Sequence, residues 1–253
     1  MKISASIVIY KEDKDTLKKV IDSFLSIKDI KKEFIIVDNS PDNELKTFCE
    51  SFEGLSYIYS GENLGFGRGH NLAFKNLKEK SDIHMIINPD VYFYSDEISS
   101  FLNWFYEHND ISLSTTKVCY PDGENQNIIR NVPTIIDLIK RKLKINSGEL
   151  YIEDNYIKEV PFAHGCFFIF KTEVFEKLDG FDERFFMYME DLDIFIRAKK
   201  YGKTVINTNY KIYHEFRKGS SKSLKLLFWH ICSAIKFFFK YKNIDLNKYN
   251  KFY

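Results

Sequence analysis

The first 90 residues alternate between short apolar runs and segments in which apolar residues recur at helical spacing. The apolar runs predict strands at residues 4–10, 34–37, 55–59 and 83–87. The segments between them predict helices at residues 13–27, 43–52 and 71–80. Continuously apolar strands that alternate with amphipathic helices are typical of a parallel sheet covered on both faces. The pattern therefore predicts an α/β fold with a mostly parallel central sheet flanked by helices.

The second half of the chain has a less regular pattern. It predicts, in order, a helix at 95–108, a strand at 112–119, a short basic helix at 134–143, a strand at 162–170, a helix ending near 201 and a strand at 204–213. We expect one domain made of two halves that share a sheet, residues 1–95 and 96–215. A basic, aromatic helical tail is expected at 216–253.

Composition narrows the classes of function. The net charge is +1, so the chain has no global field that would attract nucleic acid. The four cysteines include no C-x-x-C pair, which argues against a zinc cluster and for a reducing compartment. The sequence starts without a signal-peptide pattern, and no apolar run reaches the ~18 residues of a membrane span. We expect a cytoplasmic protein, with membrane contact at most peripheral, on the inner face of the plasma membrane.

Polar residues follow three of the predicted strands, and in such sheets ligands bind beyond the carboxyl ends of the strands. Tyr10 ends the first strand. Asp38 ends the second, where it could bind the base or ribose of a nucleotide or could cap the next turn. Asn88-Pro89-Asp90 follows the fourth strand. Its oxygens suit a hard divalent cation, Mg²⁺ or Mn²⁺, although the same tripeptide is also good turn chemistry.

A glycine-rich segment, residues 61–71, precedes the third predicted helix. Its glycines, Gly65, Gly67 and Gly69, match neither a dinucleotide-binding fingerprint nor a P-loop. Backbone N–H groups before a helix can still approach an anion, and Arg68 adds a cation. The segment therefore predicts a loop that faces a diphosphate or, alternatively, an ordinary flexible turn.

Residues 180–193 place five carboxylates among large apolar and aromatic side chains. An ionised carboxylate taken out of water costs several kcal/mol unless it is paired or bound to a metal. One interpretation is therefore a carboxylate with a shifted pKa that does acid or base work. The other is a helix start, with Glu190, Asp191 and Asp193 in its first turn. Asp182 and Glu183 are expected to belong to a turn before the site.

Two features near the C-terminal end leave alternatives open. His214 ends the last predicted strand, as a metal ligand or as a structural residue. A tail helix at 221–242 is expected to carry a lysine stripe opposite an apolar face, and the stripe consists of Lys222, Lys225, Lys236 and Lys240. Such a helix suits the surface of an anionic membrane, or it docks on the core with its lysines in water.

In this order and spacing, the motifs resemble glycosyltransferase family 2, whose members are inverting sugar-nucleotide enzymes. The resemblance extends through nearly the whole chain and implies a GT-A fold with a Rossmann-like sheet. Within the family, it is greatest to the rhamnosyltransferases that build bacterial O-antigen and other surface polysaccharides. The motifs are Ser6-Ile-Val-Ile-Tyr10, Ile36-Val-Asp-Asn-Ser40, Asn63-Leu-Gly-Phe-Gly67, Asn88-Pro-Asp-Val91, Arg130-Asn-Val-Pro133, Gly165-Cys-Phe-Phe-Ile-Phe-Lys171, Gly180-Phe-Asp-Glu-Arg-Phe-Phe-Met-Tyr188, Glu190-Asp-Leu-Asp193 and Trp229-His230.

The resemblance implies roles for individual residues. Asp191, with Glu190 beside it, is expected to be the general base, and Asp90 to bind the cation that bridges the donor diphosphate. His214 matches a position that completes the metal site in some relatives, and Asn88 stands where many have an aspartate. The residues expected to bind the donor are Tyr10, Asp38, Asn63, Gly65, Arg68, Asn71, Asn88 and Asp90. Those expected to bind the acceptor are Phe186, Tyr188, Arg130 and Trp229.

The sequence thus predicts an inverting, metal-dependent glycosyltransferase. The expected donor is a dTDP- or UDP-sugar, with L-rhamnose as the candidate sugar. The expected acceptor is a hydroxyl of a lipid-linked oligosaccharide or polysaccharide, with peripheral contact to anionic membrane through residues 221–242. The alternatives are a non-catalytic carbohydrate-binding module and a sugar-phosphate nucleotidyltransferase. The latter should carry a Gly- and Arg/Lys-rich loop after the first strand, which Tyr10-Lys11-Glu12-Asp13 does not provide.

Overall fold

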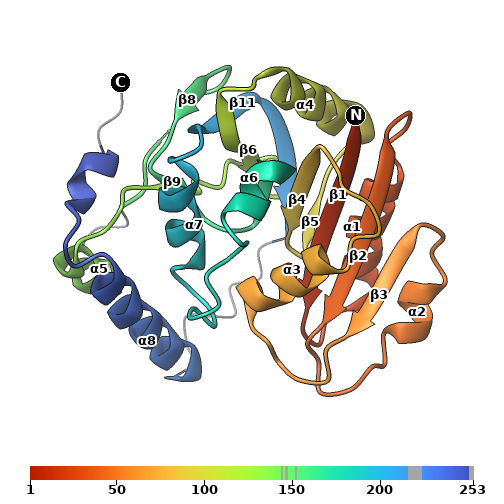
Figure 1. Cartoon of the computed structure of the whole chain (residues 1–253), viewed down its shortest axis with the longest axis horizontal. Helices are drawn as coiled ribbons and strands as arrows, with labels where there is room; N and C mark the ends of the chain where they lie inside the picture. Colours follow the sequence, from red (N-terminus) through yellow and green to blue (C-terminus); the bar gives the residue numbers. More distant parts are fainter. Residues whose placement is uncertain (144, 146–147, 152, 216–223, 251–253) are drawn as a thin grey trace.

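The computed structural model describes residues 1–253 except 144, 146–147, 152, 216–223 and 251–253 (Figure 1). Its first half is a parallel sheet in the order β3-β2-β1-β4. The strands are β1 (Lys2–Ile9), β2 (Lys31–Asp38), β3 (Leu55–Tyr59) and β4 (Ile83–Ile87). The helices between them are α1 (Lys14–Leu25), α2 (Lys46–Glu50) and α3 (Phe66–Lys75). The predicted α/β fold is confirmed, because β1 pairs in parallel with both β2 and β4, and β2 pairs in parallel with β3.

The second half continues the same sheet with mixed strand directions. The next strand, β10 (Phe167–Lys171), runs antiparallel between β4 and β6 (Ile111–Cys119). The long strand β11 (Lys203–His214) is parallel to β6. Two short strands, β5 (Val91–Tyr92) and β8 (Ile157–Glu159), pair with β11 in antiparallel fashion. Because β10 joins the two halves, the core runs without interruption through both.

A loop divides the predicted strand 162–170 into two. Its first part, β9 (Phe162–Ala163), pairs with β7 (Ile129–Arg130) in a small separate sheet. Its second part is β10, and residues 164–166 form the connection. The helices of this half are α4 (Ser95–Glu107), α6 (Thr172–Lys177) and α7 (Glu190–Ala198). Residues 180–193 are called the acidic-aromatic segment, and their C-terminal part begins α7. Because α7 packs on β9, this segment lies against the connection.

The remaining helices lie on the side of the molecule opposite β3 (Figure 1). They are α5 (Ile135–Lys142), α8 (Leu224–Lys240) and the short 3₁₀ helix η2 (Leu246–Asn250). Thr134 and Asp137 form a capping box that starts α5. Asn250 donates a hydrogen bond to the carbonyl of Val132 and accepts one from its N–H, which ties the chain after α8 to the segment before α5.

The tail helix packs on the core through the buried Phe237, and its lysine stripe is divided, because Lys225 is exposed whereas two other lysines contact the core side. Lys240 is only 18% exposed and forms ion pairs with Asp182 and Asp193, while Lys236 donates to the carbonyl of Arg184. Lys222 lies outside the described residues. The exposed side of α8 instead carries Leu224, Phe228, Ile231, Ile235 and Phe239. Within the described part of the chain, no helix is both long and apolar enough to cross a membrane.

Candidate active site

The carboxyl end of β2 holds a carboxylate that is fixed on both oxygens. Asp38 is fully buried; its Oδ2 accepts a hydrogen bond from the Tyr57 hydroxyl at 2.6 Å and its Oδ1 accepts one from the Ser40 N–H at 2.8 Å. Burial, and then the contact with Asp38, raise the pKa of Tyr57. Tyr10, at the end of the neighbouring strand β1, is half exposed. The parallel pairing of β1 with β2 therefore brings these two predicted donor-binding residues to one edge.

Asn39, which is not among the predicted site residues, connects this edge to the glycine-rich segment. Its Nδ2 donates to the carbonyl of Gly65 at 3.1 Å. Its Oδ1 is buried and has no hydrogen-bond partner among the described residues. A buried acceptor without a partner costs free energy. This oxygen is therefore available to a donor group on a ligand that binds at the strand ends.

The glycine-rich segment enters its helix earlier than the sequence predicted. Helix α3 begins at Phe66 instead of residue 71, so Gly67 and Gly69 lie inside it. A Cβ on Gly67 would stand 2.8 Å from the Cβ of Phe181, and one on Gly69 would stand 2.6 Å from Val8. These two glycines allow close packing of the helix. Gly65 has a φ of +80°, and a Cβ there would lie 2.1 Å from the carbonyl oxygen of Phe186.

The same segment is bonded to the acidic-aromatic segment more than 100 residues away. The side-chain amide of Asn71 accepts from the Phe181 N–H and donates to the Phe181 carbonyl, both at 2.8 Å. Arg68 Nε lies 3.7 Å from Glu183 Oε2. Asn63 accepts from the Gly65 N–H within its own turn. These hydrogen bonds have a structural role that the sequence did not reveal, and the donor contacts of Asn63, Arg68 and Asn71 stay predictions.

Asp90 and His214 meet where β4 and β11 end. His214 Nε2 lies 3.2 Å from Asp90 Oδ1, and His214 Nδ1 lies 3.0 Å from Gln126 Oε1. Gln126 Nε2 donates to the His214 carbonyl at 2.8 Å, which orients Oε1 to accept from Nδ1. In the neutral ring with its proton on Nδ1, Nε2 keeps a lone pair and can bind a cation beside the carboxylate. The two residues therefore fit a divalent cation whose other ligands come from substrate and water.

The loop between β9 and β10 connects this pair to the predicted base. Burial, and then the charge of Asp90, raise the pKa of the Cys166 thiol to about 12, with a further contribution from Asp191. The Asp90 and Asp191 carboxylates are therefore both close enough to the Cys166 thiol to affect its pKa. The carbonyl of Cys166 accepts from the Asn88 N–H at 2.9 Å. Among the described residues, no group of three or more His, Cys, Asp and Glu side chains forms a ready-made metal cluster.

Asp191 is the predicted base, and the same loop supplies it with a partner that the sequence missed. Its Oδ1 accepts from the Leu192 N–H at 2.8 Å, and its Oδ2 lies 3.5 Å from His164 Nδ1. The sequence predicts an unbroken strand here, and only the neighbouring Gly165 hints at the break that places His164 beside Asp191. His164 can hold the orientation of the Asp191 carboxylate and stabilise its charge.

Glu190 adds a second buried carboxyl at the start of α7. Its Oε2 has no hydrogen-bond partner among the described residues. Burial, and then the neighbouring Asp191, raise the pKa of Glu190 to about 8. Tyr188 and Met189, the two residues before it, have φ values of +69° and +68°. Backbone strain in non-glycine residues is concentrated at functional sites, and here it adjoins the predicted base.

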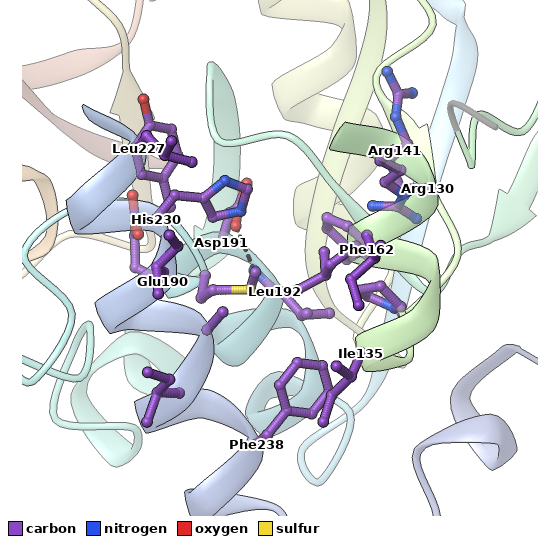
Figure 2. Close-up of a pocket in the computed structure, with 18 of the residues that line it drawn as sticks. Arg130, Ile135, Arg141, Phe162, Glu190, Asp191, Leu192, Leu227, His230 and Phe238 are labelled. Atoms are coloured by element: carbon purple, nitrogen blue, oxygen red, sulfur yellow. Dashed lines mark hydrogen bonds between the residues drawn. The ribbon is translucent and has the colours of Figure 1, made fainter. Parts of the chain in front are cut away.

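Asp191 opens into a cleft of about 1190 Å³ between α5, α7 and α8 (Figure 2). Of the predicted acceptor-binding residues, Arg130 and Tyr188 line it. Arg130 forms an ion pair with Glu149 at 2.9 Å. The other two, Phe186 and Trp229, pack on each other with ring centroids 4.5 Å apart. The four predicted residues therefore form two pairs, one that lines the cleft and one that does not.

Known proteins of similar sequence are sugar-transfer enzymes. The chain is 27% identical over 247 residues to "Rhamnosyltransferase WbbL" of Escherichia coli strain K12. This alignment covers 91% of this chain and 90% of that protein. It is 26% identical over 232 residues to "Low-salt glycan biosynthesis hexosyltransferase Agl10" of Haloferax volcanii, covering 80% and 74% of the two chains. It is also 24% identical over 190 residues to "N-acetylglucosaminyl-diphospho-decaprenol L-rhamnosyltransferase" of Mycobacterium tuberculosis strain H37Rv, covering 66% and 61%.

Solved structures with the same fold confirm the predicted GT-A architecture. GalNAc-T7, solved with UDP, GalNAc and Mn²⁺, superimposes with a TM-score of 0.67 at 13% identity, covering 86% of this chain and 44% of that one. The mannosyltransferase PcManGT of Pyrobaculum calidifontis, solved with GDP-Man and Mn²⁺, gives 0.62 at 16% identity, covering 93% and 64%. At these identities the likeness concerns the fold alone.

The family assignment comes from the sequence model of "Glycosyl transferase family 2", which matches residues 4–179. The match includes the strand-end residues Asp38 and Asp90 and the glycine-rich segment. It ends before Asp191 and His214, whose places in the site come from the tertiary structure. Because the match spans well over half of the chain, the chain belongs to glycosyltransferase family 2.

Proposed function

We propose that the protein transfers L-rhamnose, with inversion, from a dTDP- or UDP-sugar to a hydroxyl of a lipid-linked oligosaccharide in bacterial surface polysaccharide biosynthesis. Family membership makes the chain a glycosyltransferase, and the names of the E. coli and M. tuberculosis relatives support the sugar. The name of the latter also supports a lipid diphosphate acceptor.

One observation carries the proposal: two carboxylates from distant parts of the chain, Asp90 and Asp191, lie near the same loop residue, Cys166, in contrasting surroundings. Asp90 pairs with His214, and Asp191 opens into the cleft beside His164. A displacement at an anomeric carbon needs a group that stabilises the leaving diphosphate and a base for the attacking hydroxyl. Asp90 and Asp191 would divide these two tasks between them.

On the donor side, Asp90 and His214 would hold a divalent cation, Mg²⁺ or Mn²⁺. Such an ion neutralises charge on the leaving diphosphate. Asp38, immobilised by Tyr57 and the Ser40 N–H, would bind the nucleoside, and the unpartnered Asn39 Oδ1 would accept a hydrogen bond from it. The other residues of the proposed donor site are Tyr10, Asn63, Gly65, Arg68, Asn71 and Asn88.

On the acceptor side, Asp191 would accept the proton of the attacking hydroxyl, with Glu190 beside it. One base and one displacement invert the configuration, so no carboxylate nucleophile is required. Phe186, Tyr188, Arg130 and Trp229 would position the acceptor and exclude water, which limits hydrolysis of the donor. Peripheral contact with an anionic membrane through residues 221–242, on the cytoplasmic face, is part of the proposal.

The test is a thermal-shift screen of nucleotide sugars, followed by a transfer assay. A donor raises the apparent melting temperature by mass action, and we expect the largest shift with a dTDP- or UDP-sugar in the presence of Mn²⁺. The product of transfer to a synthetic lipid-diphosphate acceptor should have the anomeric configuration opposite to that of the donor. Donor binding without transfer to any acceptor would instead indicate a non-catalytic module.

A further inference from the structure

The cleft that contains Asp191 has two apolar rims, one on each of two facing helices. Ile135 and Ile139 of α5 form one rim together with Leu143, the residue after the helix, and each is more than half exposed. The other rim consists of three residues of α8, each also more than half exposed: Ile231, Ile235 and Phe239. Exposed apolar surface that is continuous across two elements marks an interaction site, because a soluble monomer rarely leaves such a patch in water.

The inner part of the cleft differs from the rims in charge. Arg130 and Arg141 lie together at one end, while Ile135 and Phe238 approach each other at the other (Figure 2). Arg141 donates through Nη2 to the Asn131 carbonyl, whereas its Nε is buried without a hydrogen-bond partner among the described residues. A buried guanidinium N–H without a partner suits an anionic ligand, which would supply the missing acceptor.

We propose that this cleft binds the lipid of the acceptor, with the hydrocarbon chain between the rims of α5 and α8 and the diphosphate beside Arg130 and Arg141. This inference rests on the proposed function, because it takes the occupant to be the acceptor. The charge distribution argues for it: an apolar channel that ends in two arginines and a catalytic carboxylate is complementary to an amphiphile with an anionic head. The volume of 1190 Å³ slightly exceeds the ~300–1,000 Å³ of ordinary small-molecule pockets.

The same arrangement identifies the side of the protein that faces the membrane. The hydrocarbon chain leaves the cleft between the two rims, so these rims must contact the bilayer that holds the rest of the lipid. Lys240 is bound to Asp182 and Asp193 on the inward side of α8 and cannot take part in that contact. The apolar rims therefore dock the enzyme on its substrate.

The experiment measures binding and does not depend on transfer. Farnesyl diphosphate is the probe, and inorganic diphosphate reports the contribution of the head group alone; both are titrated calorimetrically into the full-length protein. The test variant is the double substitution Ile139→Ser and Ile235→Ser, one on each rim. Its matched control is Ile136→Ser and Phe228→Ser, which changes one exposed apolar residue on each of the same helices outside the cleft.

We expect the rim variant to bind farnesyl diphosphate at least ~10-fold more weakly than the unsubstituted protein, because two apolar contacts are lost. The control should stay within ~2-fold, and inorganic diphosphate should bind equally to all three. Equal losses in both double variants, or no preference for farnesyl over inorganic diphosphate, would overturn the proposal. So would a concentration-dependent dimer that disappears in the rim variant, because the rims would then be a contact between two copies.

These outcomes separate this inference from the proposed function. If the rims bind the probe but no sugar is transferred to any lipid diphosphate, the acceptor site stands and the reaction is wrong. If both double variants transfer sugar equally well, to long-chain and to short-chain acceptors alike, the proposed reaction is supported. The cleft then does not bind the lipid. A fold defect is excluded by equal circular dichroism spectra and by unchanged thermal shifts with the nucleotide sugar.

Discussion

The first turn of α7 carries two aspartate carboxylates, one on each side, and their surroundings are opposite. On one side, Asp193 is fully buried and bonded to Arg197, Lys240 and the Tyr241 hydroxyl. On the other, Asp191 lines the cleft, and His164 is the only basic side chain within 4 Å of it among the described residues. A carboxylate held by cations stabilises a fold, whereas one that faces a cleft without a strong cation can accept a proton. The contrast is the one expected between a structural aspartate and the proposed base.

The two sides also differ in backbone strain and in satisfied hydrogen bonds. The strained residues Tyr188 and Met189 and the unpartnered Glu190 Oε2 belong to the cleft side. On the structural side, Asp182 bonds to Arg184 and Lys240, and Arg197 donates to the carbonyls of Leu178 and Gly180. Stable contacts on one side thus hold the strained residues on the other in place.

The largest expected effect comes from Asp191→Asn. Removing the base should lower kcat ~1,000-fold, within the range of general-base catalysis, and should leave donor binding and thermal stability nearly unchanged. Transfer kinetics with a saturating donor, together with a thermal shift by the donor, measure both quantities. Normal turnover in this variant would refute the assignment of the base.

The opposite result is expected for Asp193→Asn. Arg197 and Lys240 would lose a buried counter-charge, so the free energy of unfolding should fall by about 3 kcal/mol. Urea denaturation measures this loss. Below the unfolding transition, kcat should change little. A large loss of kcat in a variant that remains folded would mean that the two sides of the turn do not have separate tasks.

A smaller effect is expected for His164→Ala. Loss of the imidazole that lies 3.5 Å from Asp191 Oδ2 should lower kcat by up to about tenfold, because a partly exposed polar partner of a carboxylate contributes ~1 kcal/mol, and should leave donor affinity unchanged. His164→Asn keeps a hydrogen-bond donor at this position and should restore part of the rate. If both variants were equally impaired, or neither were, His164 would not orient the base.

The last expected effect is a change in how stability depends on pH. The pKa of Glu190 is raised from 4.5 to about 8, so the folded protein holds a proton that the unfolded chain releases. The resulting stabilisation is complete below pH ~4.5 and is lost as the pH rises through about 8. Glu190→Gln has no proton to lose, so its free energy of unfolding should fall less between pH 5 and pH 8. Parallel curves for the two proteins would show that Glu190 is ionised in the fold.

Much of the fold and part of the site could be predicted from local pattern. The strand at 83–87 is predicted to the residue, because four of its five residues are apolar and polar residues flank it on both sides. The start of α3 is predicted five residues late, because Gly67 and Gly69 look like loop residues until Phe181 and Val8 are seen to pack against them. His164 escaped notice because a single glycine, Gly165, is the only sign in the sequence that its strand is broken.

The sequence by itself determined the α/β fold, the family and the polar edge at the strand ends, because periodicity and short motifs are local properties of the chain. Only the tertiary structure decided which partners each carboxylate meets and which side of α8 faces water. Asp191 and Asp193 differ in their partners, and those partners, His164, Lys240 and Tyr241, lie 27 to 48 residues away in the chain. The charge that a buried aspartate meets depends on how distant elements pack, and no local pattern contains that information.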